Sequence, residues 1–157
     1  MKPTTYIAID PGKSGGIAVR YPDGRVVAFA MPNEDGDLLD YIAGLESGCR
    51  CDDWDIQAVV EKVSGFAGVG HPGSRMFSFG QSYGFLLGAL MAMSIPVQLI
   101  RPQQWQAKLQ LGKASTHGSK AAWKRHLRDE ARRRFPSLKP TLATADALLM
   151  LDACWQK

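Results

Sequence analysis

The pattern of hydrophobic positions opens the chain with three short β-strands. Residues 5–10 form one apolar run, and residues 16–21 form a second run after the turn at Pro11 and Gly12. The turn sequence PDG at 22–24 then predicts that residues 25–30 return as a third strand. The first 30 residues therefore predict an antiparallel meander of three strands.

Strands and helices are predicted to alternate in the remainder of the chain. Residues 37–45 have the pattern of a short helix, which a loop over 48–53 follows, and residues 56–61 form an apolar strand of the kind buried in parallel sheets. A fifth strand is expected at 97–101, just before Pro102. The further helices are expected at 81–93, 103–109, 120–135 and 144–155.

The segment 64–80 is rich in glycine and aromatic residues and has no clear hydrophobic period. We therefore expect a long loop, and long loops in compact domains are usually functional or disordered. Around it, the order of elements predicts an α/β fold with a mixed five-stranded sheet and helices on both faces. No repeat, low-complexity tract or linker divides the 157 residues, so a single domain over 1–157 is expected.

The composition is ordinary for a soluble globular protein, with 45 % hydrophobic and 22 % charged residues. The longest apolar stretch, over 85–93, is about half the length that a bilayer requires. The first residues lack a signal-peptide core, and the three cysteines lack zinc spacing, so free thiols are expected. These features favour a cytoplasmic protein of a bacterium or phage, or one of an organellar nucleoid, with no membrane partner.

The net charge of +4 is distributed unevenly along the chain. Residues 101–139 contain eleven Lys and Arg against two acidic residues, a net +9, which leaves −5 for the rest. This asymmetry predicts a basic surface beside an acidic centre. Such a combination suits an enzyme that holds a nucleic acid over metal-binding carboxylates.

Three acidic residues interrupt apolar surroundings. Asp10 ends the first apolar run, Glu61 ends the strand at 56–61, and Asp146 lies in the apolar helix at 144–155. A carboxylate in an apolar setting costs several kcal/mol unless it is compensated. A shared divalent cation would compensate all three. The alternatives are local: Asp10 caps the Pro-Gly turn, Glu61 faces solvent, and Asp146 interacts with the helix dipole.

These three side chains can converge in a mixed sheet. If the strands of Asp10 and Glu61 are neighbours, their ends lie together, and a final helix packed across those ends can deliver Asp146. Nucleases with two metal ions need such convergence, because one ion activates water while the other stabilises the leaving oxygen, with the ions about 4 Å apart.

The same residues resemble the motifs of RuvC-type Holliday junction resolvases. The first motif of that family is similar to residues 7–18, IAIDPGKSGGIA, the second to residues 59–61, VVE, and the last to residues 145–149, ADALL. The resemblance is closest to the chloroplast and phage-like branch, through residues 79–84, FGQSYG, residues 102–105, PQQW, and residues 132–138, RRRFPSL. The matches run in order through nearly the whole chain.

This resemblance implies an RNase H-like fold and a homodimer. It also implies that Mg²⁺ or Mn²⁺, with two ions per active site, supports symmetric nicking of two strands of a four-way DNA junction. Asp10, Glu61 and Asp146 match the positions of metal ligands.

One position departs from the family pattern. The family has a fourth ligand, Asp or His, three or four residues before the last acid, where a helix places both on one face. Here those positions hold Ala143 and Leu142. Three explanations compete: three carboxylates and water suffice, His117 or Asp152 substitutes for the ligand, or Ala143 is an engineered loss of the ligand. Asp152, six residues beyond Asp146, faces elsewhere on a helix.

The basic segment is predicted to contact DNA phosphates, although a solvated helix face is the alternative. In the family, basic residues near here lie close to the scissile phosphate, so Lys113 or Lys120 is expected to act in catalysis by stabilising developing charge. The residues of this segment expected to bind DNA are Lys108, Lys120, Lys124, Arg125, Arg128 and Arg132.

The segment 64–80 is predicted to reach the crossover of the junction. Phe66 and Phe77 would stack on unpaired bases, while Arg75 or His71 would contact phosphates or base edges. Alternatively, the aromatic residues anchor the loop on the core. In the next helix, Gly84, Gly88 and Ala92 form a stripe of small residues that favours either a dimer contact or packing on the chain's own sheet.

The function predicted from the sequence is therefore metal-dependent resolution of four-way DNA junctions. A catalytically silent junction-binding protein is the first alternative. The second is a phosphotransfer enzyme of the actin and sugar-kinase type, whose phosphate loop is similar to residues 10–15, DPGKSG. Those enzymes enclose ATP between two such domains, and this chain has the length of one.

Overall fold

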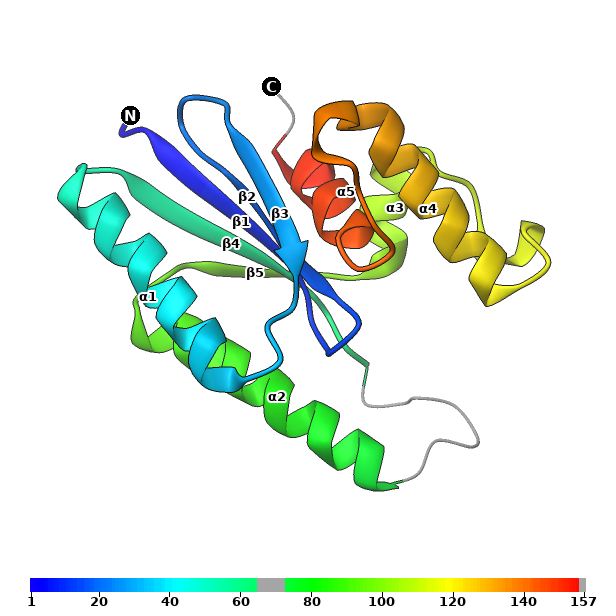
Figure 1. The fold of residues 1–157 in the computed structure, drawn as a ribbon, viewed down its shortest axis with the longest axis horizontal. Helices are drawn as coiled ribbons and strands as arrows, with labels where there is room; N and C mark the ends of the chain where they lie inside the picture. Colours follow the sequence, from blue (N-terminus) through cyan, green and yellow to red (C-terminus); the bar gives the residue numbers. More distant parts are fainter. Residues whose placement is uncertain (65–72, 156–157) are drawn as a thin grey trace.

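A mixed five-stranded sheet forms the centre of the molecule (Figure 1). The structure, a computed structural model of the chain, describes residues 1–64 and 73–155. The strand order is β3-β2-β1-β4-β5, with β1 antiparallel to β2, β2 antiparallel to β3, and β4 parallel to both β1 and β5. The strands are β1 (Thr4–Asp10), β2 (Gly16–Arg20), β3 (Val26–Ala30), β4 (Asp55–Glu61) and β5 (Val97–Ile100). The predicted meander and the predicted parallel strands are confirmed.

Helices cover both faces of this sheet (Figure 1). One face packs against α1 (Asp35–Cys51) and α2 (Gly73–Ala92). The other face packs against α3 (Pro102–Lys108), α4 (Lys120–Arg134) and α5 (Ala145–Cys154). Short 3-10 turns precede and follow α4, at Ala114–Thr116 and Pro136–Leu138. Among the described residues, no helix is both long and apolar enough to cross a bilayer.

The alternation of side chains along β1 explains how the two layers pack. Ile7 and Ile9 point into the core beneath α1 and α2, whereas Ala8 points to the opposite face, beneath α5. The small side chains of Ala8 and Ala18 let α5 approach the sheet closely. All residues from Ala145 to Leu151 are buried, so α5 is a central helix of this core.

The first helix is longer than the sequence predicts. Residues 48–51, expected in a loop, form the last turn of α1, and the helix also begins two residues before the expected start. Leu38, Ile42 and Cys49 form its buried face, and this spacing carries the apolar stripe past Gly44 and Gly48. Packing against the core therefore outweighs the cost of about 1 kcal/mol that each glycine imposes on a helix.

The predicted loop over 64–80 is wrong from residue 73 onward, because α2 begins at Gly73. The buried residues of this helix are Leu86, Ala89 and Leu90, all in its second half. Its first turns extend beyond the core and therefore show no hydrophobic period in the sequence. Arg75 and Phe77 consequently lie on a helix, while Phe66 and His71 lie outside the described residues.

Candidate metal centre

Two of the three predicted ligands lie at the ends of neighbouring parallel strands. Asp10 is the last residue of β1, and Glu61 is the last residue of β4. The register pairs Ile9 with Val60, so the next residue of each strand carries a carboxylate at the same edge of the sheet. The arrangement expected from the two apolar runs is therefore confirmed.

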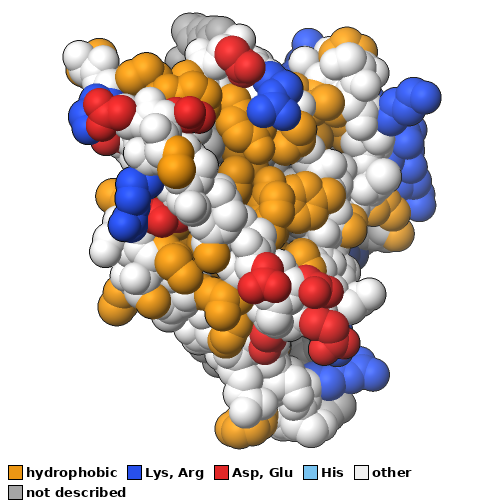
Figure 2. Space-filling view, turned by 60° about the vertical axis from the view of Figure 1, so that its left-hand side comes forward, with side chains coloured by type: hydrophobic (Ala, Val, Ile, Leu, Met, Phe, Trp, Pro, Cys, Tyr) orange, Lys and Arg blue, Asp and Glu red, His pale blue; other side chains and the backbone are white. Residues whose placement is uncertain are grey.

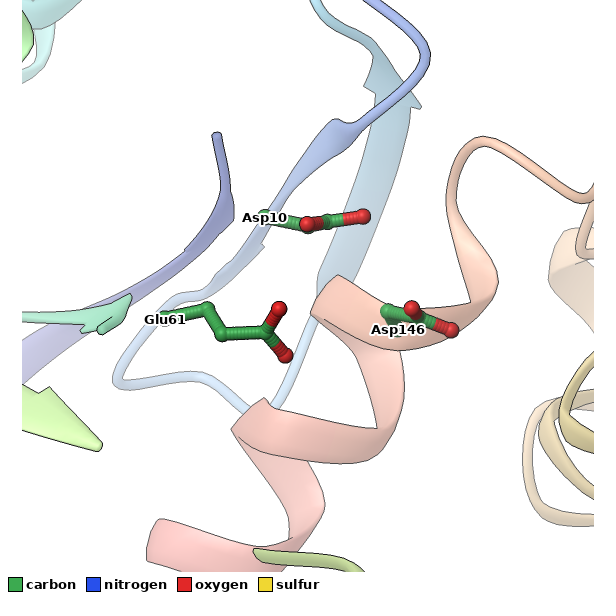
Figure 3. Close-up of side chains that lie close together, drawn as sticks. All are labelled: Asp10, Glu61 and Asp146. Atoms are coloured by element: carbon green, nitrogen blue, oxygen red, sulfur yellow. The ribbon is translucent and has the colours of Figure 1, made fainter. Parts of the chain in front are cut away.

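The third carboxylate comes from the first turn of α5. Asp146 lies there, close to Asp10 and Glu61 at the ends of β1 and β4 (Figure 3). This approach depends on Gly16, because a Cβ at that position would lie 2.5 Å from the carbonyl oxygen of Ala143 and 2.9 Å from that of Phe29. The backbone before α5 is thus held directly against the sheet.

The three carboxylates form one compact cluster (Figure 3). One oxygen from each of Asp10, Glu61 and Asp146 lies within 4.8 Å of the other two. Asp10 is 9 % exposed and Asp146 is 4 % exposed, and Oδ1 of Asp146 is buried with no hydrogen-bond partner among the described residues. Oxygen donors at this spacing, one of them buried and unpaired, fit a divalent cation such as Mg²⁺.

The electrostatics of the cluster favour uptake of positive charge. The pKa of Asp10 is raised to about 8, mainly by burial, with repulsion from Asp146 and Glu61 adding to the shift and Lys124 opposing it. Burial also raises the pKa of Glu61, with Asp146 adding to the effect and a hydrogen bond from Trp105 opposing it. The buried carboxylates are costly to ionise because they lose hydration and because they repel one another. A bound cation would offset both the desolvation and the repulsion.

The indole of Trp105 fixes the orientation of Glu61. Trp105 is fully buried on α3, and its Nε1–H donates a hydrogen bond to Oε2 of Glu61 over 3.0 Å. A buried tryptophan usually needs a partner for this N–H, and here the partner is a predicted ligand. Trp105 is therefore a positioning residue, a role that the sequence analysis did not assign.

A lysine enters the cluster from α4. Lys124 Nζ donates a hydrogen bond to Oδ2 of Asp146, and the two form an ion pair. Burial lowers the pKa of Lys124, but the attraction of Asp146, Asp10 and Glu61 outweighs it, so the pKa lies above its ordinary value. The predicted place of Lys124 is the DNA-binding surface, whereas the structure brings its ammonium to the carboxylate of Asp146.

The position of the expected fourth ligand lies outside α5. The helix begins at Ala145 with Thr144 as its N-cap, so Leu142 and Ala143 belong to the preceding turn. Leu142 is exposed and Ala143 is half-buried.

Neither of the two candidate substitutes belongs to the cluster. The ring of His117 packs against Trp123 and His126, and Asp152 pairs with Arg134 at 2.7 Å. Within the described ranges, the only grouping of three or more possible ligands consists of Asp10, Glu61 and Asp146.

The other basic residues predicted to act lie mostly at the surface. Lys108, Lys113, Lys120 and Arg125 are exposed, and Lys120 is the first residue of α4. Arg128 pairs with Asp129, and Arg132 donates a hydrogen bond to the carbonyl oxygen of Pro140. Figure 2 shows Lys and Arg side chains along one edge of the molecule, and others close to acidic side chains around a central hydrophobic area. The predicted roles of these residues in DNA binding and catalysis remain predictions.

The first turns of α2 flank a pocket next to the metal centre. Phe77 is exposed, while Arg75 and Phe79 line a cavity of about 380 Å³ together with Pro11 and Gly12, which directly follow Asp10. Arg75 thus lies on the same side of the molecule as the turn that follows Asp10. The predicted contacts of Arg75 and Phe77 with junction DNA remain predictions.

Comparisons with known proteins relate this architecture to solved structures. No protein-family model matches the chain. No curated protein sequence matches it either. The structure of RuvC from Thermus thermophilus is similar at 21 % identity and a TM-score of 0.52, over 95 % of this chain and 92 % of that one. T. thermophilus RuvC in complex with a Holliday junction substrate is similar at 20 % identity and a TM-score of 0.54, over 96 % of this chain and 91 % of that one.

These similarities confirm the predicted fold. The chain has the mixed α/β architecture of RuvC, which is RNase H-like, over nearly its whole length. At about one identical residue in five, the likeness concerns the fold alone. The narrower resemblance to the chloroplast and phage-like branch remains a prediction.

Proposed function

We propose that this protein is a metal-dependent endonuclease that resolves four-way DNA junctions. The observation that carries the proposal is the cluster of Asp10, Glu61 and Asp146 at one edge of a RuvC-like sheet. Buried carboxylates are costly to assemble without a function that uses them. Their positions also coincide with the three motifs in which the sequence resembles the resolvases.

The residues of this chain have distinct roles in the proposed reaction. Asp10, Glu61 and Asp146 would hold Mg²⁺ or Mn²⁺, which would supply Lewis-acid activation of water and stabilisation of charge on the phosphate. Trp105 keeps the Glu61 carboxylate in place through its hydrogen bond. Lys113 or Lys120, both exposed, would approach the scissile phosphate from the loop and the start of α4.

The proposed substrate is a four-way junction rather than a linear duplex. The related fold of T. thermophilus RuvC has been solved with a Holliday junction substrate, which supports this class of DNA. The segment 101–139 carries a net +9 and includes α4, so it offers phosphate contacts next to the carboxylates. Phe77 and Arg75, at the start of α2, are proposed to contact the crossover.

We also propose a homodimer formed through α2. Gly84, Gly88 and Ala92 are exposed, so this stripe does not pack on the chain's own sheet. A Cβ at Gly80, Gly84 or Gly88 would meet nothing within 4 Å, and Phe77 and Met91 on the same helix are 68 % and 77 % exposed. A symmetric junction requires two active sites related by a two-fold axis, which a C2 dimer provides.

The decisive experiment is cleavage of a synthetic mobile four-way junction. With Mn²⁺ or Mg²⁺, the protein should yield nicked linear duplexes from paired symmetric incisions, whereas EDTA or Asp10→Asn should abolish the products while junction binding persists. A linear duplex of the same sequence serves as the matched control. Linear duplex cut as readily as the junction would contradict junction resolution.

A catalytically silent junction-binding protein is the second candidate, because position 143 lacks a ligand and Lys124 occupies part of the cluster. Tight, selective junction binding without any incision in Mn²⁺ would establish it in place of the nuclease. The complementary measurement is junction cleavage by Ala143→Asp, which adds a carboxylate at this position. If this variant cuts the junction and the parent does not, the missing fourth ligand explains why the parent is inactive.

A further inference from the structure

A second cavity lies at the end of the sheet opposite to the candidate metal centre. Its volume is about 590 Å³, and Arg20, the last residue of β2, lines it. Arg20 pairs with Tyr6 of β1, four residues before Asp10, which corresponds to about 13 Å along the strand. Figure 1 shows the turn between β2 and β3 and the end of α4 at this same end of the molecule. The cavity is therefore separate from the carboxylate cluster.

Three arginines from different elements line this cavity. Arg20 ends β2, Arg25 directly precedes β3, and Arg134 ends α4. The lining contains one carboxylate, that of Asp152, so three arginines and one acid give a net charge of +2. Guanidinium groups bind phosphate and carboxylate oxygens through paired N–H donors. The cavity therefore has the chemistry of an anion site.

Two of these arginines are held by contacts that leave donors free. Arg20 Nη1 donates a hydrogen bond to the carbonyl oxygen of Trp155. The guanidinium of Arg25 lies over the ring of Tyr21, 3.9 Å from its centroid. Asp23 lies 3.9 Å from Arg25, but both side chains are more than half exposed, and such pairs contribute little. Because the two guanidinium groups are already ordered, a ligand would lose less conformational entropy on binding them.

The third arginine has a donor without a partner. Arg134 Nη1 donates to Oδ2 of Asp152 over 2.7 Å, and Nη2 donates to the carbonyl oxygen of Leu109 over 3.4 Å. The Nε of Arg134 is buried and has no hydrogen-bond partner within the described parts of the chain; Oε2 of Glu130, at 3.8 Å, is too distant. A buried N–H without an acceptor is costly, and an anion in the cavity would offer one.

One wall of the cavity comes from the turn that follows α4. Residues 134–138, RFPSL, line the cavity and have no role in the candidate metal centre. Phe135 and Leu138 pack against the core, and Pro136 restricts the backbone of the turn, so this wall is fixed. A planar apolar group can lie against the wall while an attached anionic group meets the arginines. A nucleotide combines these two groups.

We propose that this cavity binds a nucleotide, with its phosphate on Arg20, Arg25 and Arg134 and its base against Phe135. The volume of about 590 Å³ lies within the ordinary range of small-molecule sites. A free nucleotide and the phosphorylated end of a DNA strand share this chemistry. The site is separate from the proposed nuclease reaction and does not depend on it.

Calorimetric titration with deoxyadenosine 5′-monophosphate in EDTA tests the proposal without metal. The nucleotide should bind more tightly than inorganic phosphate, and deoxyadenosine, which lacks the phosphate, should not bind. Arg25→Gln should weaken nucleotide binding about tenfold, because it removes a charged donor. The matched control is Arg50→Gln on α1, where the side chain is 76 % exposed and lies outside the cavity; this variant should match the parent.

Arg25→Lys keeps the charge but loses the planar pair of donors, so its affinity for the nucleotide should lie between those of the parent and Arg25→Gln. The order of the three small probes on the parent needs no variant at all. Three results would each overturn the inference: no binding of the nucleotide at millimolar concentration, equal losses in Arg25→Gln and Arg50→Gln, or tighter binding of an acidic peptide than of the nucleotide.

Two further probes distinguish the source of the nucleotide. A short single strand with a 5′-phosphate is compared with the same strand without one. Preference for the phosphorylated strand that is lost in Arg25→Gln supports a strand end as the ligand, whereas equal binding of both strands beside binding of the mononucleotide supports a free nucleotide. Absence of junction cleavage by the parent would refute the proposed function and would leave these affinities unchanged.

Discussion

The indole N–H of Trp105 donates a hydrogen bond to Oε2 of Glu61 over 3.0 Å, and the two residues come from α3 and β4. Trp105→Phe removes this donor but keeps an aromatic ring in the core. We expect a loss of about 1 kcal/mol in binding of Mn²⁺, or roughly fivefold in affinity, because Glu61 loses the bond that orients it. Calorimetric titration of both proteins measures this change.

Trp123→Phe is the matched control for this substitution. Trp123 is also buried, but it lies on α4 and packs against the rings of His117 and His126 instead of a ligand. Both variants should lose stability, since each truncates a buried indole. Only Trp105→Phe should weaken the binding of Mn²⁺. If both variants lose the same affinity for Mn²⁺, Trp105 contributes to the site only through packing.

The pKa of Asp10 gives the metal-free protein a pH-dependent stability. Burial, together with repulsion from Asp146 and Glu61, raises this pKa from its ordinary value of 3.8 to about 8 in the folded state. The folded state therefore binds the proton more tightly than the unfolded state, so stability is fully present below about pH 4 and falls as pH rises toward 8. In EDTA, the free energy of unfolding should decrease across this window.

Asp10→Asn should remove most of this dependence. The amide cannot ionise, so the variant should be more stable than the parent at pH 8, by an amount on the order of 5 kcal/mol, and the difference should shrink toward pH 4. Urea unfolding at a series of pH values measures both effects. Parallel curves for the two proteins would mean that Asp10 titrates normally.

Gly16 should tolerate no side chain. In Gly16→Ala the new Cβ would approach backbone oxygens of Ala143 and Phe29 at 2.5 and 2.9 Å, so either α5 or β3 must move. We expect a loss of about 2–3 kcal/mol in stability together with weaker Mn²⁺ binding, because α5 carries Asp146. The control is Gly44→Ala on α1, where a Cβ meets nothing within 4 Å and should stabilise the helix by about 0.5–1 kcal/mol.

The exposed glycine stripe of α2 predicts a change in oligomeric state. Gly84→Glu should leave the fold of the monomer intact, since a Cβ there meets nothing within 4 Å, but it would place like charges across a two-fold contact. Sedimentation should show a dimer for the parent and a monomer for the variant. Gly36→Glu on α1, which is equally open, should remain dimeric; a shift in both variants would exclude α2 as the specific contact.

The salt dependence of junction binding tests the basic surface. Replacement of Lys120 and Arg125 by Gln should weaken binding to every junction and lower the slope of log affinity against log salt by about one per lost phosphate contact. Asp10→Asn, which removes no basic residue, should keep the slope of the parent. Binding curves at several salt concentrations measure this slope. An unchanged slope in the double variant would mean that DNA does not contact the surface of Lys120 and Arg125.

The periodicity and the ends of the apolar runs predicted the sheet and the place of Asp10 and Glu61 at its edge. Asp10 and Glu61 stand where a strand that is buried on both sides ends, and that signal is local in sequence. The start of α2 was not predictable in the same way, because the turns around Arg75 and Phe77 bury no apolar face. Helix formation there leaves no hydrophobic period to detect.

The contacts that complete the site join residues distant in sequence. Trp105 and Glu61 are 44 positions apart, and Lys124 and Asp146 are 22 apart. Both contacts depend on how α3, α4 and α5 pack on one another, which no local pattern encodes. Two signals were nevertheless available: a tryptophan in an apolar helix needs a partner for its N–H, and a lysine directly after Trp123 lies beside the buried face of α4.

The parallel pairing of β1 and β4 has a consequence for engineering this centre. Because Asp10 and Glu61 follow the paired residues Ile9 and Val60, the spacing of neighbouring strands, about 4.8 Å, sets the separation of their backbones. Side-chain substitution leaves that spacing unchanged. If the cluster binds a metal as proposed, its preference will therefore depend on the side chains of the site and on the placement of Asp146 by α5, while the strands fix the spacing of Asp10 and Glu61.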